Sequence, residues 1–233
     1  DYLILHIDPA YEAPEMEEKQ VFGVTFTQKQ NDLKLEPSCL ENIVTENKEL
    51  PDEAKEDMLI ALIALKYTQS NSVAFAYDGQ TIGIGAGQQS RVHCTRLAGS
   101  KADNWQLRLT DKVLNLPWKA GTRRPNKDNF IDRYIAMEDT PEANVDIDWT
   151  ELFETKPEPF TLEEKRQLLD KVDGVTLASD AFFPFADNID RAKASGAKYI
   201  VQPGGSTRDD LVLEACNKYG MVMCYNGFRL FHH

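Results

Sequence analysis

Two segments of the chain carry residue types that could bind a small anionic or heterocyclic molecule. The first is a glycine-rich run, Gly83-Ile-Gly-Ala-Gly87, which precedes Arg91 at the start of an expected helix. Glycines let a ligand approach backbone N–H groups, and a helix N-terminus beside a guanidinium attracts a phosphate or a carboxylate. A tight strand-to-helix turn with Arg91 solvated explains the same residues equally well. The run reads G-x-G-x-G and not G-x-G-x-x-G, so it is a weak signal for a dinucleotide cofactor.

The second segment, Asp180 to Asn188, contains three phenylalanines and a proline and ends in Asp187-Asn188 at the start of an expected helix. Exposed aromatic rings beside a helix N-terminus suit a planar heterocyclic ligand. An aromatic mini-core with Asp187 as the N-cap suits them too, and residue types alone favour that interpretation. The run Gly204-Gly205-Ser206-Thr207 follows the next expected strand. The aromatic segment and this second glycine run therefore both fall where strands of a parallel sheet end, which is where α/β proteins form ligand crevices.

The cysteines and histidines argue against a metal–thiolate site. His93-Cys94 matches part of a zinc deaminase motif, but the required glutamate and the downstream P-C-x-x-C are both missing, so we expect no zinc. Cys39, Cys94, Cys216 and Cys224 form no C-x-x-C pair. The last three lie in apolar surroundings, which predicts reduced core thiols in a cytoplasmic protein.

Composition limits the class of protein. The chain has 233 residues and is 42% hydrophobic, enough for one large domain or two small ones. Its mean hydropathy is −0.46, and it has no run of about 18 apolar residues, so we expect no membrane span. A net charge of −12 disfavours nucleic acids and anionic membranes as partners. A basic stretch from Arg91 to Arg133 suits a small anion, although solvated helix surfaces explain it as well. The chain begins at Asp1 without an initiator methionine or a signal peptide, so we expect a piece of a longer protein.

The elements that would position these residues alternate in the βαβ manner towards the C-terminus. Asp78-Gly79 predicts a hairpin, Thr161 and Glu164 predict a capping box, and the region 110–150 is the least regular. We expect strands at 1–8, 20–28, 73–77, 81–86, 175–178, 199–201 and 221–224. We expect helices at 37–47, 52–66, from about 88–90 onward, 162–172, 187–195 and 208–219. This order predicts an α/β layered fold with a mostly parallel sheet.

Several of these segments together resemble AICAR transformylase, the phosphoribosylaminoimidazolecarboxamide formyltransferase family. The resemblance rests on Lys66-Tyr-Thr-Gln-Ser-Asn-Ser72, on the run from Gly83 to Gly99, on Ser179-Asp-Ala-Phe-Phe-Pro-Phe185 and on the terminal Arg229-Leu-Phe-His-His233. It extends from the first expected strand to the last residue. The sequence looks most similar to the shorter, stand-alone form that lacks the IMP cyclohydrolase domain.

The resemblance implies a reaction and an architecture. The family transfers a formyl group from 10-formyltetrahydrofolate to the 5-amino group of AICAR ribonucleotide in purine biosynthesis. It implies two zinc-free, cytidine-deaminase-like α/β subdomains and an active site at a homodimer interface. This chain would be the C-terminal part of the transformylase: residues 1–50 would connect from the upstream subdomain, and residues 51–233 would form the C-terminal subdomain.

The resemblance also assigns roles to individual residues. The residues that would contact the nucleotide substrate are Asn71, Arg91, Phe182 and Arg229. The residues that would contact the folate are Val92, Asn129, Asp187, Ser206 and Thr207. A buried potassium ion would be held by oxygens of Leu65, Thr68, Ser70, Ser72, Asp180, Leu230 and His232.

One part of the family pattern is missing. The family's catalytic pair is an adjacent Lys-His, and no such dipeptide occurs in these 233 residues. We therefore expect no catalytic residue in this chain, the pair to lie upstream, and the isolated chain to be inactive. The family's Trp-Trp is Trp105-Gln106 here, a packing difference. The alternative is a non-catalytic ligand-binding or assembly domain that is related to the transformylase.

Overall fold

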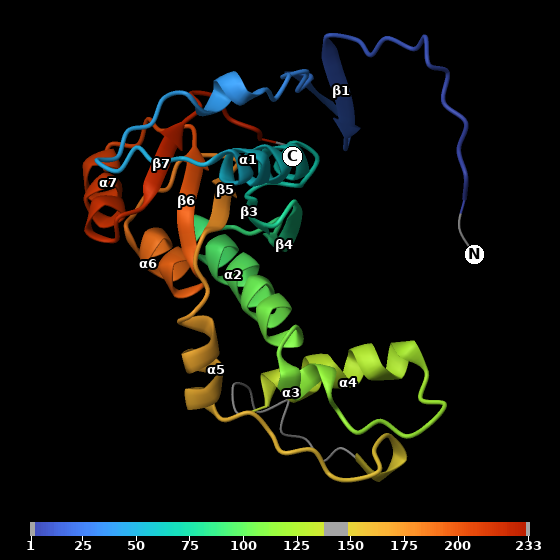
Figure 1. Cartoon of the computed structure of the whole chain (residues 1–233). Coiled ribbons are helices and arrows are strands. Elements are labelled where there is room, and N and C mark those ends of the chain that lie inside the picture. Colours follow the sequence, from blue (N-terminus) through green and yellow to red (C-terminus); the bar gives the residue numbers. More distant parts are fainter. Residues whose placement is uncertain (1–2, 138–148, 232–233) are drawn as a thin grey trace. The chain divides into compact units, whose positions relative to one another are not determined.

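The protein is described by a computed structural model, which covers residues 3–137 and 149–231. The chain divides into two compact units, residues 1–34 and residues 35–233. The first contains one antiparallel hairpin, β1 (Met16–Val21) and β2 (Val24–Lys29) (Figure 1). The expected strand at 20–28 was therefore wrong, because Phe22 and Gly23 adopt positive φ angles and reverse the chain in its middle. Residues 3–8 form no strand, so that expectation was wrong as well.

The second unit is built on a five-stranded sheet in the order β4-β3-β5-β6-β7 (Figure 1). The strands are β3 (Val73–Tyr77), β4 (Gln80–Gly85), β5 (Val175–Ser179), β6 (Ala197–Gln202) and β7 (Val222–Tyr225). β5, β6 and β7 are parallel, but β3 is antiparallel to both β4 and β5. The α/β class is confirmed, whereas the sheet is mixed because the Asp78-Gly79 hairpin returns the chain directly beside β3.

Helices cover both faces of this sheet. Val73 and Phe75 point to one face, where α2 (Arg91–Arg108), α6 (Asp187–Ala194) and α7 (Asp209–Lys218) complete an apolar cluster. Ala74 and Ala76 point to the other face, against α1 (Asp52–Lys66). This alternation follows from the two-residue period of a strand.

The segment before α1 also packs on this second face. The expected helix at 37–47 was wrong, because only a short 3-10 turn forms, η1 (Pro37–Leu40), and Ile43 then bridges to Cys224 of β7. The backbone groups of this segment hydrogen-bond to β7 at the edge of the sheet and not to one another within a helix.

A third apolar cluster lies beyond the sheet. It is formed around α3 (Asp111–Leu114), α4 (Arg124–Ala136), η3 (Trp149–Glu151) and α5 (Leu162–Leu169). The region expected to be least regular thus contains a 13-residue helix, whose Phe130 and Tyr134 pack against Phe153 and Phe160. The capping box at Thr161 and Glu164 is confirmed.

All four cysteines are free, and Cys94, Cys216 and Cys224 are buried, as expected. Burial raises the pKa of each thiol, to about 11 for Cys94 and Cys224 and to about 12 for Cys216. These thiols are therefore protonated near neutral pH and are unreactive. Within the described ranges, no helix is both long enough and apolar enough to cross a membrane.

The glycine-rich run is a strand and not a phosphate-binding turn. Gly83 and Gly85 belong to β4, and a Cβ atom there would lie 2.2 Å from the Ala98 carbonyl oxygen and 2.4 Å from the Cys94 carbonyl oxygen, respectively. The glycines thus allow β4 to lie directly against α2. The turn itself is confined to residues 86–90, with Gly87 at a φ of +64° and Ser90 as the N-cap of α2.

We predict that Gly85→Ala destabilises the chain by about 1–3 kcal/mol, because the added methyl group overpacks a helix–strand contact made by backbone atoms. The exposed Gln80 on the same strand provides the control, and Gln80→Ala should change the free energy of unfolding by less than about 0.5 kcal/mol. Urea unfolding measures both. Equal midpoints for the two variants would contradict the packing role.

Asp57 is a buried carboxylate in the middle of α1. It accepts the backbone N–H of Gly79 at 2.8 Å, and burial raises its pKa above 3.8. The folded state therefore binds this proton more tightly than the unfolded state. The contribution of Asp57 to stability is full below pH 3.8 and is lost as the pH rises through the folded pKa.

We predict that the wild-type chain loses stability relative to Asp57→Asn as the pH rises from about 3.8 through the raised pKa. The amide keeps an acceptor for Gly79 but carries no charge. Glu53→Gln, which neutralises an exposed carboxylate on the same helix, is the control. Unfolding curves between pH 3.5 and 7 test this, and a difference between wild type and Asp57→Asn that stays constant with pH would refute it.

Candidate active site

The residues singled out in the sequence meet at one edge of the sheet. β4, β5, β6 and β7 end at this edge and β3 begins there, since Val73 pairs with both Gly85 and Ser179. We call it the strand-end edge. The segments that project from it are residues 67–72, 86–91, 180–187, 203–208 and 225–231.

Asp180 is the centre of the strand-end edge. The residue is fully buried, and its carboxylate accepts the Ser70 hydroxyl at 2.5 Å, the Ser72 hydroxyl at 2.9 Å and the Ser72 backbone N–H at 3.0 Å. Its backbone carbonyl accepts the N–H of Leu230 at 2.9 Å. Asp180 therefore joins the loop after α1, the end of β5 and the C-terminal segment.

Arg91 completes this network from the start of α2. Its side chain is only 6% exposed, and its Nη1 contacts Asp180 Oδ1 and donates to the Ser72 carbonyl at 3.0 Å. Its Nη2 donates to Asn71 Oδ1 at 2.9 Å. The interpretation of Arg91 as a solvated side chain is thus wrong. Two of the four expected substrate contacts, Asn71 and Arg91, are held as one unit.

The aromatic segment after Asp180 divides between the core and the surface. Phe183 is fully buried, and its N–H donates to Gln202 Oε1 at 2.7 Å. Phe182 is half-buried, and the guanidinium carbon of Arg229 lies 5.4 Å from the centre of its ring. The mini-core interpretation therefore holds for Phe183 alone. Phe182 and Arg229, the other two expected substrate contacts, lie together at the strand-end edge.

Asp187 does not cap α6. The N-cap residue is Ala186, and Asp187 is the first helical residue, exposed, with its carboxylate accepting the Asn188 amide at 3.0 Å. The N-cap interpretation was wrong because the buried Asn188 secures this turn instead: its amide also donates to the Phe185 carbonyl, and its oxygen accepts the Thr95 hydroxyl. The Asp187 carboxylate is left at the surface.

The remaining folate candidates occupy two different places. Ser206 and Thr207 follow β6 at the strand-end edge, and Val92 is the second residue of α2, beside Arg91. Asn129 lies on α4, whose Asp128 pairs with Arg108 at the far end of α2. At 1.5 Å per residue, Arg108 is about 25 Å along the helix from Arg91. Within one chain, Asn129 is therefore not brought together with the others.

The expected potassium ligands are partly assembled. Ser70, Ser72 and Leu230 surround Asp180, and the Leu65 carbonyl accepts the N–H of Thr68 at 3.0 Å. His232 lies outside the described residues. Within the described part of the chain, no cluster of three or more histidine, cysteine, aspartate or glutamate side chains could hold a metal ion.

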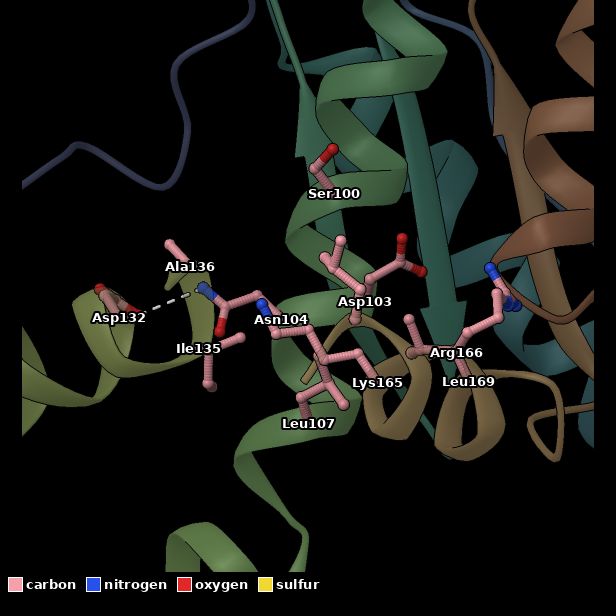
Figure 2. A pocket seen from close by; sticks show the side chains of 11 residues that line it. Ser100, Asp103, Asn104, Leu107, Asp132, Ile135, Ala136, Lys165, Arg166 and Leu169 are labelled. Atoms are coloured by element: carbon pink, nitrogen blue, oxygen red, sulfur yellow. Dashed lines mark hydrogen bonds between the residues drawn. The ribbon is translucent and has the colours of Figure 1, made fainter. Parts of the chain in front are cut away.

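A separate cavity of about 500 Å³ lies between α2, α4 and α5 (Figure 2). Charged side chains that line this cavity already have partners within the protein. The Asp103 carboxylate accepts hydrogen bonds from the Arg191 guanidinium at 2.9 Å and from the Ser195 hydroxyl at 2.5 Å, and Lys165 donates to the Met137 carbonyl. Burial raises the pKa of Asp103. Asn104 binds Asp132 through its amide nitrogen, as Figure 2 shows, while its oxygen has no partner among the described residues. None of the described residues that the sequence singled out lines this cavity, so we do not assign the active site to it.

Two contacts at the strand-end edge were not expected from the sequence. Gln202 closes β6 and holds the aromatic segment, and Arg208 packs on Phe185 at 5.3 Å. A buried glutamine at the end of an apolar strand, just before Pro203-Gly204-Gly205, was the available signal for the first. Arg208 follows Ser206-Thr207 directly and could have been considered with them.

The fold and this edge define an α/β domain in which a buried polar network and partly exposed aromatic side chains meet at one edge of the sheet. Residues 1–101 match the AICARFT/IMPCHase bienzyme family. The chain is 33% identical over 219 residues to the bifunctional purine biosynthesis protein PurH of Magnetococcus marinus, covering 94% of this chain and 30% of that protein. It is 34% identical over 191 residues to PurH of a Ruegeria species (82% of this chain, 25% of that protein) and 32% identical over 182 residues to PurH of Xylella fastidiosa (78% and 22%).

The chain therefore belongs to the AICARFT/IMPCHase family, as a relative of its AICAR transformylase region. It spans between about a fifth and a third of the length of these relatives.

We predict that breaking the Arg91–Asp180 pair from one side is costly, because it leaves one charge buried without its partner. Asp180→Ala should destabilise the chain by about 3–5 kcal/mol. Asp180→Ala combined with Arg91→Met should recover part of this loss, because no buried charge remains.

The exposed Lys55–Asp52 pair provides the control, and Asp52→Ala should cost less than about 1 kcal/mol. Chemical unfolding of the single and double variants gives the coupling energy. Additive losses at positions 91 and 180 would show that the pair is not the organising contact.

Proposed function

We propose that this chain is the C-terminal part of an AICAR transformylase, which transfers the formyl group of 10-formyltetrahydrofolate to the 5-amino group of AICAR ribonucleotide. The observation that carries the proposal is the joining of Asn71, Arg91 and Asp180 into one buried network beside the Phe182–Arg229 pair. Four sequence segments that resemble the family thus converge on one site. The relatives are named as purine biosynthesis proteins, and the family description names the transformylase.

The chemistry explains why such a site would be rigid. The attacking amine is attached to an electron-poor imidazole and is a weak nucleophile. Catalysis therefore depends on positioning two heterocycles, removing a proton and stabilising an oxyanion. In this proposal Phe182 packs on the substrate heterocycle, while Arg91, Asn71 and Arg229 anchor its polar groups. The folate is bound by Asp187 through its pterin ring and by Val92, Asn129, Ser206 and Thr207.

The proton is moved by a group outside this chain. Asp180 is buried in its ion pair, and no Lys-His pair occurs in the sequence. We place the catalytic pair in the upstream part of the transformylase region, and we place the active site at a homodimer interface of a cytoplasmic enzyme. Asn129 lies on α4, near the end of α2 that is far from Arg91, and this position fits a site that a second copy completes.

The residues around Asp180 fit an oxygen-bound potassium ion. The hydroxyls of Ser70 and Ser72 donate to Asp180, and hydroxyl and carbonyl oxygens are the neutral ligands that such an ion takes. Such an ion would hold the loop after α1 against the C-terminal segment. It would be structural, since Asp180 and the serines are engaged with one another.

The same observations support one alternative, a ligand-binding or assembly domain without catalysis. The strand-end edge offers anchors and stacking surfaces, and its exposed Asp187 carboxylate is assigned to the folate and not to proton transfer. The two functions differ in whether a catalytic partner segment restores turnover.

Complementation tests the proposed function. The 233-residue chain should show no formyl transfer alone, because general acid–base catalysis supplies about 10²–10⁴-fold and half of the pocket is missing. Turnover should appear when the chain is mixed with a separately expressed segment that contains the Lys-His pair, and it should disappear when that histidine is changed to alanine. Turnover by the chain alone, or none in the mixture, would contradict the proposal.

A second prediction concerns Asp187. Asp187→Asn replaces one acceptor oxygen with a donor that opposes the pterin N–H groups, so folate affinity should fall about tenfold or more. Stability should stay within about 1 kcal/mol, because the carboxylate is exposed and does not cap α6. Asp173→Asn, in an exposed ion pair before β5, is the matched control. Calorimetric titration with folate and urea unfolding separate the two effects. Lost stability with unchanged folate affinity would make Asp187 structural only.

A further inference from the structure

Arg208 and Phe185 form a contact that links two parts of the strand-end edge. The guanidinium carbon of Arg208 lies 5.3 Å from the centre of the Phe185 ring. Arg208 directly follows Ser206-Thr207, and Phe185 lies two residues before Asp187. The contact therefore connects the two segments that carry the proposed folate residues.

Both side chains are available to a ligand. Phe185 is 50% exposed, and Arg208 is exposed. The backbone N–H of Arg208 donates to the Ser206 hydroxyl oxygen at 3.2 Å, whereas its guanidinium forms no hydrogen bond or ion pair with the described residues. This contrasts with Arg91 and Arg191, whose guanidinium groups are bound to buried or half-buried carboxylates.

A guanidinium over an aromatic ring keeps its N–H donors directed outward in its own plane. Such a group is suited to a carboxylate, which it can bind with two parallel hydrogen bonds. The remaining surface of Phe185 offers an apolar face to a second ring. The pair thus presents an aromatic surface and a cationic end, side by side, on a chain whose net charge is −12.

We propose that Phe185 and Arg208 bind the aminobenzoyl-glutamate end of the folate. This inference rests on the proposed function. A folate consists of a pterin, an aminobenzoyl ring and a glutamate that carries two carboxylates. With the pterin at Asp187, the aminobenzoyl ring packs on Phe185, and the Arg208 guanidinium binds a glutamate carboxylate. Arg208 also offsets the repulsion between this carboxylate and the acidic protein.

The test compares two probes of similar size, folic acid and its dimethyl ester, whose glutamate carboxyls carry no charge. Calorimetric titration of the 233-residue chain measures both. Arg208→Ala should weaken folic acid binding about two- to fivefold, as expected for a solvent-exposed ion pair, and should leave ester binding unchanged. Phe185→Ala should weaken both probes, because both carry the aminobenzoyl ring. Arg124→Ala, which removes a 93% exposed cation from α4, should alter neither.

The outcomes separate this inference from the proposed function. If Arg208→Ala weakens both probes equally or neither, the glutamate assignment is wrong while folate binding stands. If the wild-type chain binds neither probe, even when it is mixed with the upstream segment that completes the pocket, the folate assignment of the proposed function is overturned and this inference with it. Circular dichroism of each variant confirms that the fold is retained, and Arg208→Gln repeats the test with a side chain of similar length.

Discussion

The buried ion pair between Arg91 and Asp180 is the constraint on which the strand-end edge depends. Two charges removed from water are stable only when each is paired and hydrogen-bonded. Here Ser70, Ser72 and Asn71 complete the set. Satisfying this one pair fixes the loop after α1, the start of α2, the end of β5 and the C-terminal segment in a single arrangement. The buried ion pair thus fixes the position of these segments, as packed apolar side chains fix the elements around a hydrophobic core.

Replacing a buried ion pair with well-packed apolar residues is often neutral or stabilising, so we infer that this pair serves the site more than the overall stability. In the proposed function, such a rigid network would position a weak nucleophile and a formyl donor, for which a misplacement of about 1 Å can cost about a hundredfold in rate. The aromatic segment likewise combines a buried anchoring residue with exposed side chains. Phe183 is anchored in the core through Gln202, and so Phe182 and Phe185 are presented on either side of it.

Much of the second unit could be predicted from the sequence. Asp78-Gly79, the capping box at Thr161 and the βαβ alternation after residue 175 each follow from local rules, and all three are confirmed. The role of the glycine run could not be predicted from neighbouring residues, because Gly83 and Gly85 are required by close contact with backbone carbonyl groups of α2, which follows later in the sequence. The hairpin at Phe22-Gly23 was missed because its strands are exposed and show no alternation between buried and exposed residues.

The sequence indicated which segments meet at the strand-end edge, but not the contacts that they make there. The segments that resemble the family converge, yet no pattern indicated that Arg91 would be buried against Asp180 or that Asp187 would leave the capping position. Both outcomes depend on side chains that lie about a hundred residues apart in the sequence. The cavity of Figure 2 is lined by none of the described residues that the sequence singled out.

The most direct test of the central claim is a titration of the ¹⁵N-labelled chain with AICAR ribonucleotide, followed by the backbone amide resonances. The account predicts that the largest shifts occur at residues 70–72, 91–92, 180–182 and 229, which surround the Arg91–Asp180 pair. Shifts confined to the residues that line the cavity between α2, α4 and α5, or no shifts at all, would contradict it.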